Sequence, residues 1–288
     1  FSIFHAISAF CNAGFDLMGR KYGAYNSLSA YSSDFLINIV IMLLILIGGI
    51  GFIVWDDITK HGLNFRKYRL HSKIVIFASV MLFVIPTLIF FITEQTTVLS
   101  NMGFSHAVLV SAFSDVTART AGFNTVDFKF FSDAGKMVFI IIMFIGAGSG
   151  STAGGIKMTT FFVLLAQVRA NVLNKKITEV FNRTISNDIV VRAATISTIN
   201  ISLILVSAIV INYIDKINIL DLLFEVTSAV STVGVTTGIT RDLNVISKSI
   251  LIILMYLGRV GGLSFALSLT HNKNQVKLRN PVEDISIG

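Results

Sequence analysis

Long apolar runs separated by short polar segments form the dominant pattern of this chain. Crossing a bilayer as a helix takes about 20 apolar residues, and five runs meet that length: 35–54, 72–93, 136–165, 193–214 and 249–269. The third run is interrupted in its middle by GAGSGSTAGGIK, residues 146–157, which is too rich in glycine for a stable helix. The pattern predicts an all-α membrane protein in which one span is broken.

Three windows repeat one motif, a short amphipathic segment followed by a turn of small residues around a glycine. They are FHAISAFCNAGFDLMG (4–19), VLVSAFSDVTARTAGFNTVDF (108–128) and LDLLFEVTSAVSTVGVTTGIT (220–240). The central glycines, Gly14, Gly122 and Gly234, are 108 and 112 residues apart, and each window precedes an apolar run with its own glycine cluster. Self-similarity at this spacing indicates a repeated membrane unit.

The distribution of charge predicts how the chain is oriented. Segments 55–73 and 169–192 each hold five Lys or Arg against two acids, whereas 94–135 and 215–248 each hold four acids against two or three basic residues. By the positive-inside rule, the basic segments and the C-terminal tail are cytoplasmic. Two spans separate successive glycine turns, so all three turns face the outside, unlike the motifs of inverted repeats.

The segment before each glycine is expected to be a re-entrant helix. A segment such as 106–118 is too short for a hydrocarbon core of roughly 30 Å, so it must enter, turn at the glycine and return. Unpaired backbone at that depth is tolerated where it lines water or binds an ion. No carboxylate stands among the residues immediately before the glycines, which favours a monovalent cation over a divalent one. The candidate filter residues are Asn12, Ala13, Gly14, Thr120, Ala121, Gly122, Thr232, Val233 and Gly234.

Composition supports lipid as the surroundings and argues against other functions. The chain is 53% hydrophobic and 14% charged, with a mean hydropathy of +0.77, whereas soluble domains carry about 25% charged residues. The net charge of +7 is explained by topology, so nucleic-acid binding is not expected. The five histidines are scattered, the one cysteine forms no internal disulfide, and no nucleophile–base pair occurs at a workable spacing. Neither a metal centre nor an enzyme is therefore expected.

The motifs FHAISAFCNAGF, TARTAGFNT, IGAGSGSTAGGIK and STVGVTTG resemble the second, third and fourth pore-loop repeats of the Trk/Ktr/HKT superfamily of potassium transporters, closest to the bacterial Ktr membrane subunit KtrB. The resemblance implies M1–pore-helix–M2 units around a central pore, three of an expected four. Residues 1–71 would be the second repeat without its M1, 72–192 the third, 193–270 the fourth and 271–288 a cytoplasmic tail. The chain opens at Phe1, in the middle of this pattern, so N-terminal sequence is expected to be missing.

The resemblance also implies that the glycine-rich loop acts as an intramembrane gate under the filter. The candidate gate residues are Gly146, Gly148, Ser149, Gly150, Ser151, Thr152, Gly154, Gly155, Lys157 and Arg259. Lys157 and Arg259 are interpreted as the only basic residues buried in the spans, where charges are usually functional. Arg119 either steadies its pore helix through carbonyls or faces an acid such as Asp115 or Glu225, and a structural role is favoured.

The function implied by the resemblance is K⁺ uptake, with K⁺ as the transported ion and Na⁺ as a possible second. The implied assembly is a homodimer in a bacterial cell membrane, seated on a cytosolic ring of KtrA-like RCK subunits that bind ATP, ADP or cyclic di-AMP. The basic run at 60–73 either orients the chain or docks this ring. The alternatives are an alternating-access secondary cation transporter, a sodium-permeable relative and a non-transporting membrane scaffold.

Overall fold

Helices make up most of the computed structural model, which describes residues 1–175 and 177–260. The helices in chain order are α1 (Ser2–Phe10), α2 (Gly19–Tyr22), α3 (Phe35–Ile50), α4 (Phe52–His61), α5 (Leu70–Thr93), α6 (Phe104–Ala118), α7 (Asp133–Ile145), α8 (Met158–Val172), α9 (Asn187–Asp215), α10 (Ile219–Val230) and α11 (Val245–Val260). Strands β1 (Thr178–Val180) and β2 (Arg183–Ile185) form a small antiparallel hairpin. This content agrees with the predicted all-α class.

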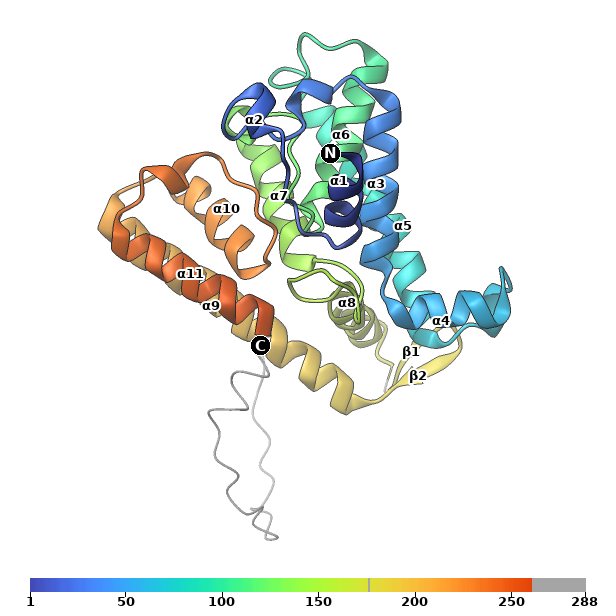
Figure 1. Ribbon diagram of the computed structural model, residues 1–288. Helices are drawn as coiled ribbons and strands as arrows, with labels where there is room; N and C mark the ends of the chain where they lie inside the picture. Colours follow the sequence, from blue (N-terminus) through green and yellow to red (C-terminus); the bar gives the residue numbers. More distant parts are fainter. Residues whose placement is uncertain (176, 261–288) are drawn as a thin grey trace.

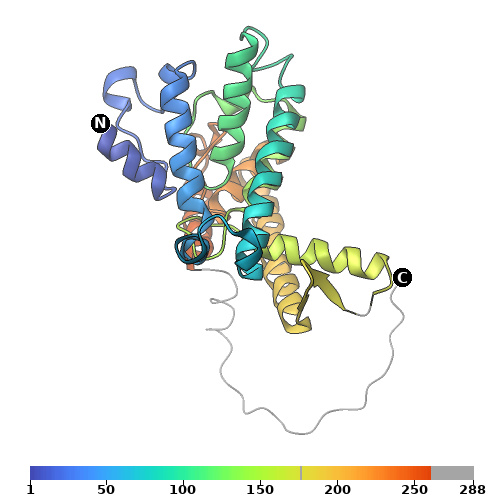
Figure 2. The ribbon, with the colours of Figure 1, turned by 90° about the vertical axis from the view of Figure 1, so that its right-hand side faces the viewer.

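A helix, a loop and a second helix occur in this order three times. The first helices, which we call the short helices, are α1, α6 and α10, and the helices that follow them are α3, α7 and α11. The second helix is longer than the first in two of the units, whereas α7 with 13 residues is slightly shorter than α6 with 15. Helix α1 packs on α3, α6 packs on the preceding α5, and α10 packs on both α9 and α11 (Figures 1 and 2). The three units coincide with the three repeated windows. The tail at 271–288, including its implied dimer contacts, lies outside the described residues.

The first predicted span, 35–54, is shorter than the sequence suggested. Helix α3 ends at Ile50, and α4 leaves it at an angle of 92° after Gly51. The φ angle of Gly51 is +95°, and a Cβ at this position would lie 2.5 Å from the carbonyl oxygen of Ser149. Only glycine fits such a bend, so residues 52–54 belong to α4 and the prediction that the span continues to 54 is wrong.

The third predicted span, 136–165, is broken where its glycine content predicted a break. Helix α7 ends at Ile145, and α8 begins at Met158. The intervening loop at 146–157 contains no helical turn. The chain therefore carries two shorter helices in place of one span, with an irregular segment between them.

The remaining predicted spans fall on helices. Runs 72–93 and 193–214 lie within α5 and α9, the two described helices that are long and apolar enough to cross a membrane singly. Helix α11 covers the fifth run, 249–269, as far as Val260. The rest of that run lies outside the described residues.

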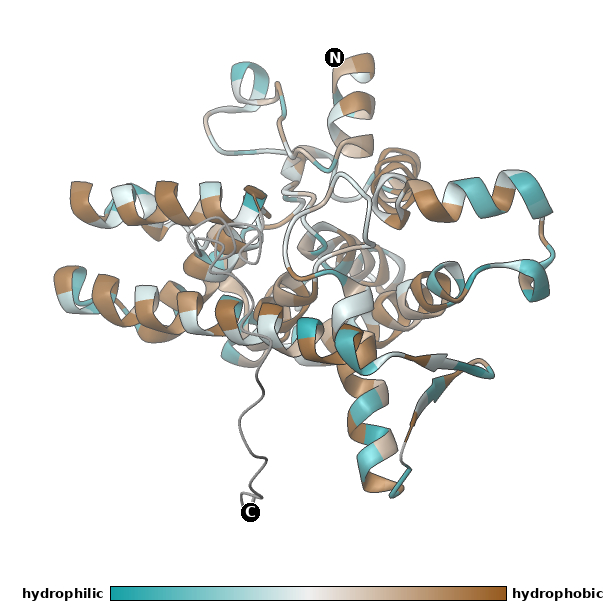
Figure 3. Cartoon of the chain, turned by 90° about the horizontal axis from the view of Figure 1, so that it is seen from below, coloured by the Kyte–Doolittle hydropathy of each residue, from teal (hydrophilic) through white to brown (hydrophobic). Residues whose placement is uncertain are grey.

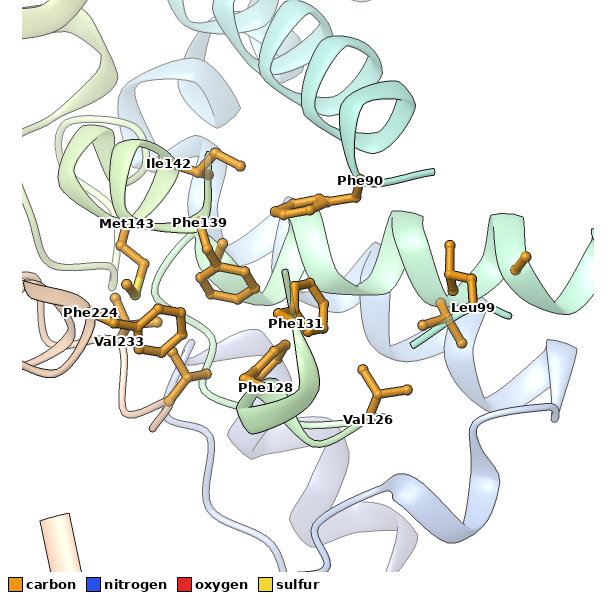
Figure 4. Close-up of a cluster of buried hydrophobic side chains, with 14 residues drawn as sticks. Phe90, Leu99, Val126, Phe128, Phe131, Phe139, Ile142, Met143, Phe224 and Val233 are labelled. Atoms are coloured by element: carbon orange, nitrogen blue, oxygen red, sulfur yellow. The ribbon is translucent and has the colours of Figure 1, made fainter. Parts of the chain in front are cut away.

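Five phenylalanine rings hold two of the units together (Figure 4). They are Phe90 of α5, Phe128 in the short 3₁₀ helix η3 (Phe128–Phe130), Phe131, Phe139 of α7 and Phe224 of α10. The centroids of Phe128 and Phe139 are 4.7 Å apart, and those of Phe139 and Phe224 are 5.2 Å apart. Aromatic pairs at such separations contribute about 0.5–1.5 kcal/mol beyond their buried area. The rings therefore fix α10 against the preceding unit.

A buried carboxylate fixes the start of α7. Glu94, directly after α5, accepts a hydrogen bond from the backbone N–H of Ser132 at 3.0 Å and another from its hydroxyl at 2.6 Å. The same hydroxyl accepts a bond from the N–H of Gly135 at 3.0 Å. Negative charge is stabilised at a helix N-terminus. Glu94 thus ties the end of α5 to the beginning of α7.

Glycines let two of the longer helices approach the ends of the short helices. A Cβ on Gly48 of α3 would lie 1.9 Å from the carbonyl oxygen of Phe10, the last residue of α1. A Cβ on Gly258 of α11 would lie 2.0 Å from the carbonyl oxygen of Val230, the last residue of α10. The first and third units therefore share the same contact between a glycine and the last carbonyl of the short helix. This contact fixes the position of the carboxyl end of that helix.

The two basic segments lie at one end of the molecule. Helix α4 and the β1–β2 hairpin lie at the same end in two perpendicular views (Figures 1 and 2), so the basic segments 55–73 and 169–192 share that end. Figure 3 shows hydrophilic colour on these elements, while the helices α9 and α11 are mostly apolar. Large apolar side chains are exposed along the outer helices, among them Leu36, Leu43, Val80, Ile209 and Ile252. Such extensive apolar exposure is expected where lipid is the solvent.

Candidate functional site

The three glycine turns meet where α1, α6 and α10 end. A Cβ on Gly14 would lie 2.6 Å from the carbonyl oxygen of Ala121 and 2.9 Å from the Cα of Gly122. A Cβ on Gly122 would lie 2.6 Å from the carbonyl oxygen of Val233 and 3.2 Å from the Cα of Gly14. Windows that are more than 100 residues apart in the chain are therefore neighbours in space, and the structure brings the predicted filter residues into one site.

The same backbone conformation recurs in all three turns. The central glycines have φ angles of +71°, +83° and +90° in chain order. The residue two places before each glycine is also left-handed although it carries a side chain: these are Asn12, Thr120 and Thr232, with φ angles of +50°, +65° and +53°. Such a conformation costs on the order of 1–3 kcal/mol and tends to occur at functional sites. The sequence motif did not predict this second strained position.

Three consecutive carbonyl groups in each turn accept no hydrogen bond from the described residues. They belong to residues 12–14, 120–122 and 232–234. Burial differs along the turns: Asn12, Thr120, Ala121 and Val233 are buried, whereas Ala13 and Gly234 are exposed and the three other residues are half-buried. A buried carbonyl without a partner is destabilising by about 1–3 kcal/mol, and a cation held by several such carbonyls removes that penalty.

The arrangement of the three turns is open on one side. The first turn abuts the second and the second abuts the third, but a Cβ on Gly234 would meet nothing within 4 Å among the described residues. A cavity of about 570 Å³ separates the third turn from the first there, and Phe15, Glu225, Gly234 and Arg241 are among its lining residues. The first and third turns therefore line one cavity and do not touch there.

The glycine-rich loop at 146–157 lies directly against the turns. The hydroxyl of Thr152 donates to the side-chain oxygen of Asn12 at 3.3 Å. A Cβ on Gly154 would lie 1.9 Å from the hydroxyl oxygen of Thr232, so only glycine can approach the third turn this closely. The loop therefore contacts the first and third turns, on the side where α1 and α10 end.

Backbone hydrogen bonds anchor the other part of this loop to α3 and α4. The N–H of Gly148 donates to the carbonyl of Gly49 at 2.9 Å, and the N–H of Phe52 donates to the carbonyl of Gly150 at 3.1 Å. These bonds involve the bend at Gly51. The 92° bend between α3 and α4 and the loop of the broken span therefore stabilise each other, because each provides a backbone hydrogen-bond partner for the other.

Arg259 reaches the loop from α11. Its guanidinium Nη1 donates to the carbonyl oxygen of Thr152 at 2.9 Å, across 107 positions of sequence. Lys157 instead donates to the carbonyl of Ala153 within the loop. The structure thus brings Arg259, Thr152 and the filter residue Asn12 into one chain of contacts.

The prediction that Lys157 and Arg259 are the only basic residues buried in the spans is wrong. Arg259 is exposed among the described residues, whereas Lys136 in α7 and Arg119 after α6 are buried. Lys136 Nζ lies 2.8 Å from a carboxylate oxygen of Asp221, so it pairs α7 with α10. No local pattern predicts this pair, because Asp221 is 85 residues away from Lys136 in the chain.

Arg119 faces Asp115, one of the two acids considered for it, and it also contacts a carbonyl of α5. Its Nη2 lies 3.0 Å from Asp115 Oδ2, and its Nη1 donates to the carbonyl of Ser79 on α5 at 3.2 Å. The side chains of Arg119 and Asp115 are only 4% and 0% exposed. Glu225, the other acid proposed as a partner, accepts hydrogen bonds from Thr236 and Thr240 instead. The pair fixes the end of α6 against α5.

Comparisons with known proteins agree with these observations. The TrkH family model, described as a cation transport protein, matches residues 1–278. Over 295 residues the chain is 40% identical to the potassium/sodium uptake protein NtpJ of Enterococcus hirae, and over 290 residues it is 38% identical to the Ktr system potassium uptake protein B of Bacillus subtilis. Both alignments cover 100% of this chain but only 64% and 63% of the relatives.

A solved structure shows the same fold. The potassium transporter TrkH of Vibrio parahaemolyticus matches with a TM-score of 0.77 over 93% of this chain and 58% of that one, at 20% sequence identity. The predicted resemblance and the all-α membrane fold are thereby confirmed.

Removing the charge of Arg119 is expected to destabilise the protein. Arg119→Met leaves the buried carboxylate of Asp115 without its partner, which typically lowers the free energy of unfolding by about 3–5 kcal/mol. The double variant Asp115→Leu/Arg119→Met removes both charges and should recover most of that loss. Unfolding in detergent by denaturant measures both effects. A single variant as stable as the wild type, or a double variant less stable than the single one, contradicts the assignment.

Proposed function

Because the chain belongs to the TrkH family of cation transport proteins, we propose that the protein takes up K⁺ across a bacterial cell membrane through a pore. The selectivity filter of this pore is formed by the three glycine turns. The observation that carries the proposal is the convergence of carbonyl groups at residues 12–14, 120–122 and 232–234 that accept no hydrogen bond from the described residues. Backbone carbonyls in rings replace the hydration shell of a monovalent cation.

The chemistry of the turns supports K⁺ as the main ion. The filter residues carry no carboxylate, and divalent cations are usually held by charged oxygens. Na⁺ remains part of the proposal as a second ion, because the relative NtpJ is named a potassium/sodium uptake protein. The ratio of K⁺ to Na⁺ flux then depends on how rigidly the carbonyls are held.

The loop at 146–157 is proposed to be a gate. It sits against the ends of α1 and α10, where it contacts Asn12 and Thr232. The hydrogen bond from Arg259 to Thr152 holds it there. A loop without helical structure can move without breaking a helix, and its five glycines lower the conformational barrier to such movement. Release of Arg259 would open the path below the filter.

The orientation in the membrane and the partners are proposed from charge. The end that carries α4 and the hairpin faces the cytoplasm, because basic residues accumulate there. Lys60, Arg66 and Lys67 are exposed at this end and are available to a cytosolic RCK-type ring. Assembly as a homodimer belongs to the same proposal.

Replacing Gly122 tests the filter. Gly122→Ser places a Cβ 2.6 Å from the carbonyl oxygen of Val233 at a residue with φ of +83°, so the turns must separate. Rubidium uptake into liposomes containing the purified protein should fall, and the ratio of rubidium to sodium uptake should approach one.

The matched control for this test is Gly103→Ser at the other end of the same short helix. Gly103 has no atom within 4 Å of its Cβ position and no positive φ, so this variant should behave as the wild type. Wild-type uptake and selectivity in a well-folded Gly122→Ser variant would overturn the filter proposal.

Replacing Arg259 tests the gate. A hydrogen bond from a charged donor contributes about 1.5–3 kcal/mol, so Arg259→Ala should shift the closed loop toward the open one by roughly tenfold or more and raise the rate of rubidium uptake. Lys248→Ala is the control on the same helix, because Lys248 is away from the loop and donates to the carbonyl of Arg241. An Arg259→Ala variant with unchanged or lower uptake at normal stability contradicts the proposed gate.

A further inference from the structure

One hydroxyl group in each short helix is bonded to the turn that follows it. In every case the acceptor is the carbonyl of the residue directly after the central glycine. The three bonds run from Ser8 to Phe15 at 2.8 Å, from Thr117 to Phe123 at 2.6 Å and from Ser228 to Val235 at 2.7 Å. The three donors, which we call the brace residues, are all buried.

The backbone of each brace residue holds the other side of the glycine. Its carbonyl accepts the N–H of the residue directly before the glycine: Ala13 to Ser8 at 2.9 Å, Ala121 to Thr117 at 3.0 Å and Val233 to Ser228 at 2.9 Å. A single residue therefore fixes both neighbours of each glycine. The end of a helix requires the backbone bond, but nothing about a helix end requires the hydroxyl bond.

The hydroxyl bond recurs although the spacing in the sequence does not. Ser8 and Ser228 are six residues before their glycines, whereas Thr117 is five residues before Gly122. Other hydroxyls of the short helices and turns are equally buried but have no hydrogen-bond partner among the described residues: Ser114, Thr120 and Thr227. The recurrence of this hydrogen bond in all three units is therefore not explained by the number of hydroxyl groups in this region.

The brace divides the carbonyl groups of each turn into two kinds. The three carbonyls up to and including the glycine are unpaired among the described residues, and the next one is turned toward the hydroxyl of its own helix. A hydrogen bond forms near the lone-pair direction of its acceptor, so the braced carbonyl is directed toward the helix and away from the neighbouring turns. The brace therefore sets where the row of free carbonyls ends.

We propose that Ser8, Thr117 and Ser228 are positioning residues that determine ion selectivity by fixing which carbonyls of each turn are free to contact the ion. The inference rests on the proposed filter function. Discrimination between K⁺ and Na⁺ depends on the number and the rigidity of the coordinating carbonyls. Without the brace, the carbonyl after the glycine is free to rotate and the glycine beside it loses a fixed neighbour, so the cage can shrink around the smaller ion.

Thr117 offers the sharpest test because a matched threonine exists. Thr117→Val removes the hydroxyl with little change in shape, and Thr227→Val makes the same change at a buried threonine without a partner among the described residues. Thr117→Ser keeps the hydroxyl. The readout is the ratio of rubidium to sodium uptake in liposomes that contain the full-length protein.

The expected result is a loss of selectivity confined to one variant. Thr117→Val should lower the rubidium-to-sodium ratio by about threefold to tenfold, as expected for one neutral hydrogen bond, while Thr117→Ser and Thr227→Val keep the wild-type ratio. Ser8→Ala and Ser228→Ala should lower the ratio in the same direction, and they serve as the test if Thr117→Val does not fold.

Two outcomes would overturn the inference, and they differ in what else they overturn. If the wild type is selective and the brace variants keep its ratio, or if Thr227→Val loses as much selectivity as Thr117→Val, the brace has no role in selectivity and the filter proposal stands. If the wild-type protein passes rubidium no better than sodium, the filter proposal fails and the inference fails with it.

Discussion

The structure is organised around one constraint: backbone carbonyl groups are left without hydrogen-bond partners in a protein whose surroundings are lipid. Helices satisfy their own backbone, and irregular segments at membrane depth are stable only where protein, water or an ion supplies the missing partners. Here three irregular turns are brought together so that their unpaired carbonyls are neighbours. In the proposed function, a monovalent cation is the partner that compensates all of them at once.

The rest of the molecule holds these turns in place. The phenylalanine cluster packs α10 against α7, Glu94 fixes the start of α7, and the pair of Asp115 with Arg119 fixes the end of α6. Gly48 and Gly258 let α3 and α11 contact the last carbonyls of α1 and α10. Apart from the phenylalanine cluster, each of these contacts lies at the end of a helix, where a small displacement would change the separation of the turns most.

The helices, the three turns and the broken span could be predicted from the sequence, because each of them depends on a local pattern of residues. Apolar length identified the helices, the repeated windows identified the three turns that meet in the structure, and five glycines between 146 and 155 identified the broken span. The bend after Ile50 was missed because residues 52–54 are as apolar as the span before them, and only the contact of Gly51 with Ser149 reveals it. The pairing of Lys136 with Asp221 was missed because the two residues are 85 positions apart in the chain. The three hydroxyl bonds are local, but they were missed because the distance from the hydroxyl residue to the glycine is not the same in all three windows.

The central claim is that the carbonyls of the three turns bind a dehydrated monovalent cation. The most direct measurement is the anomalous diffraction of thallium or rubidium in crystals of the full-length protein. The account predicts anomalous density between the carbonyl oxygens of Ala13, Ala121 and Val233, which is displaced when K⁺ replaces the heavier ion. Heavy-ion density elsewhere in the protein together with none between these carbonyls would contradict it.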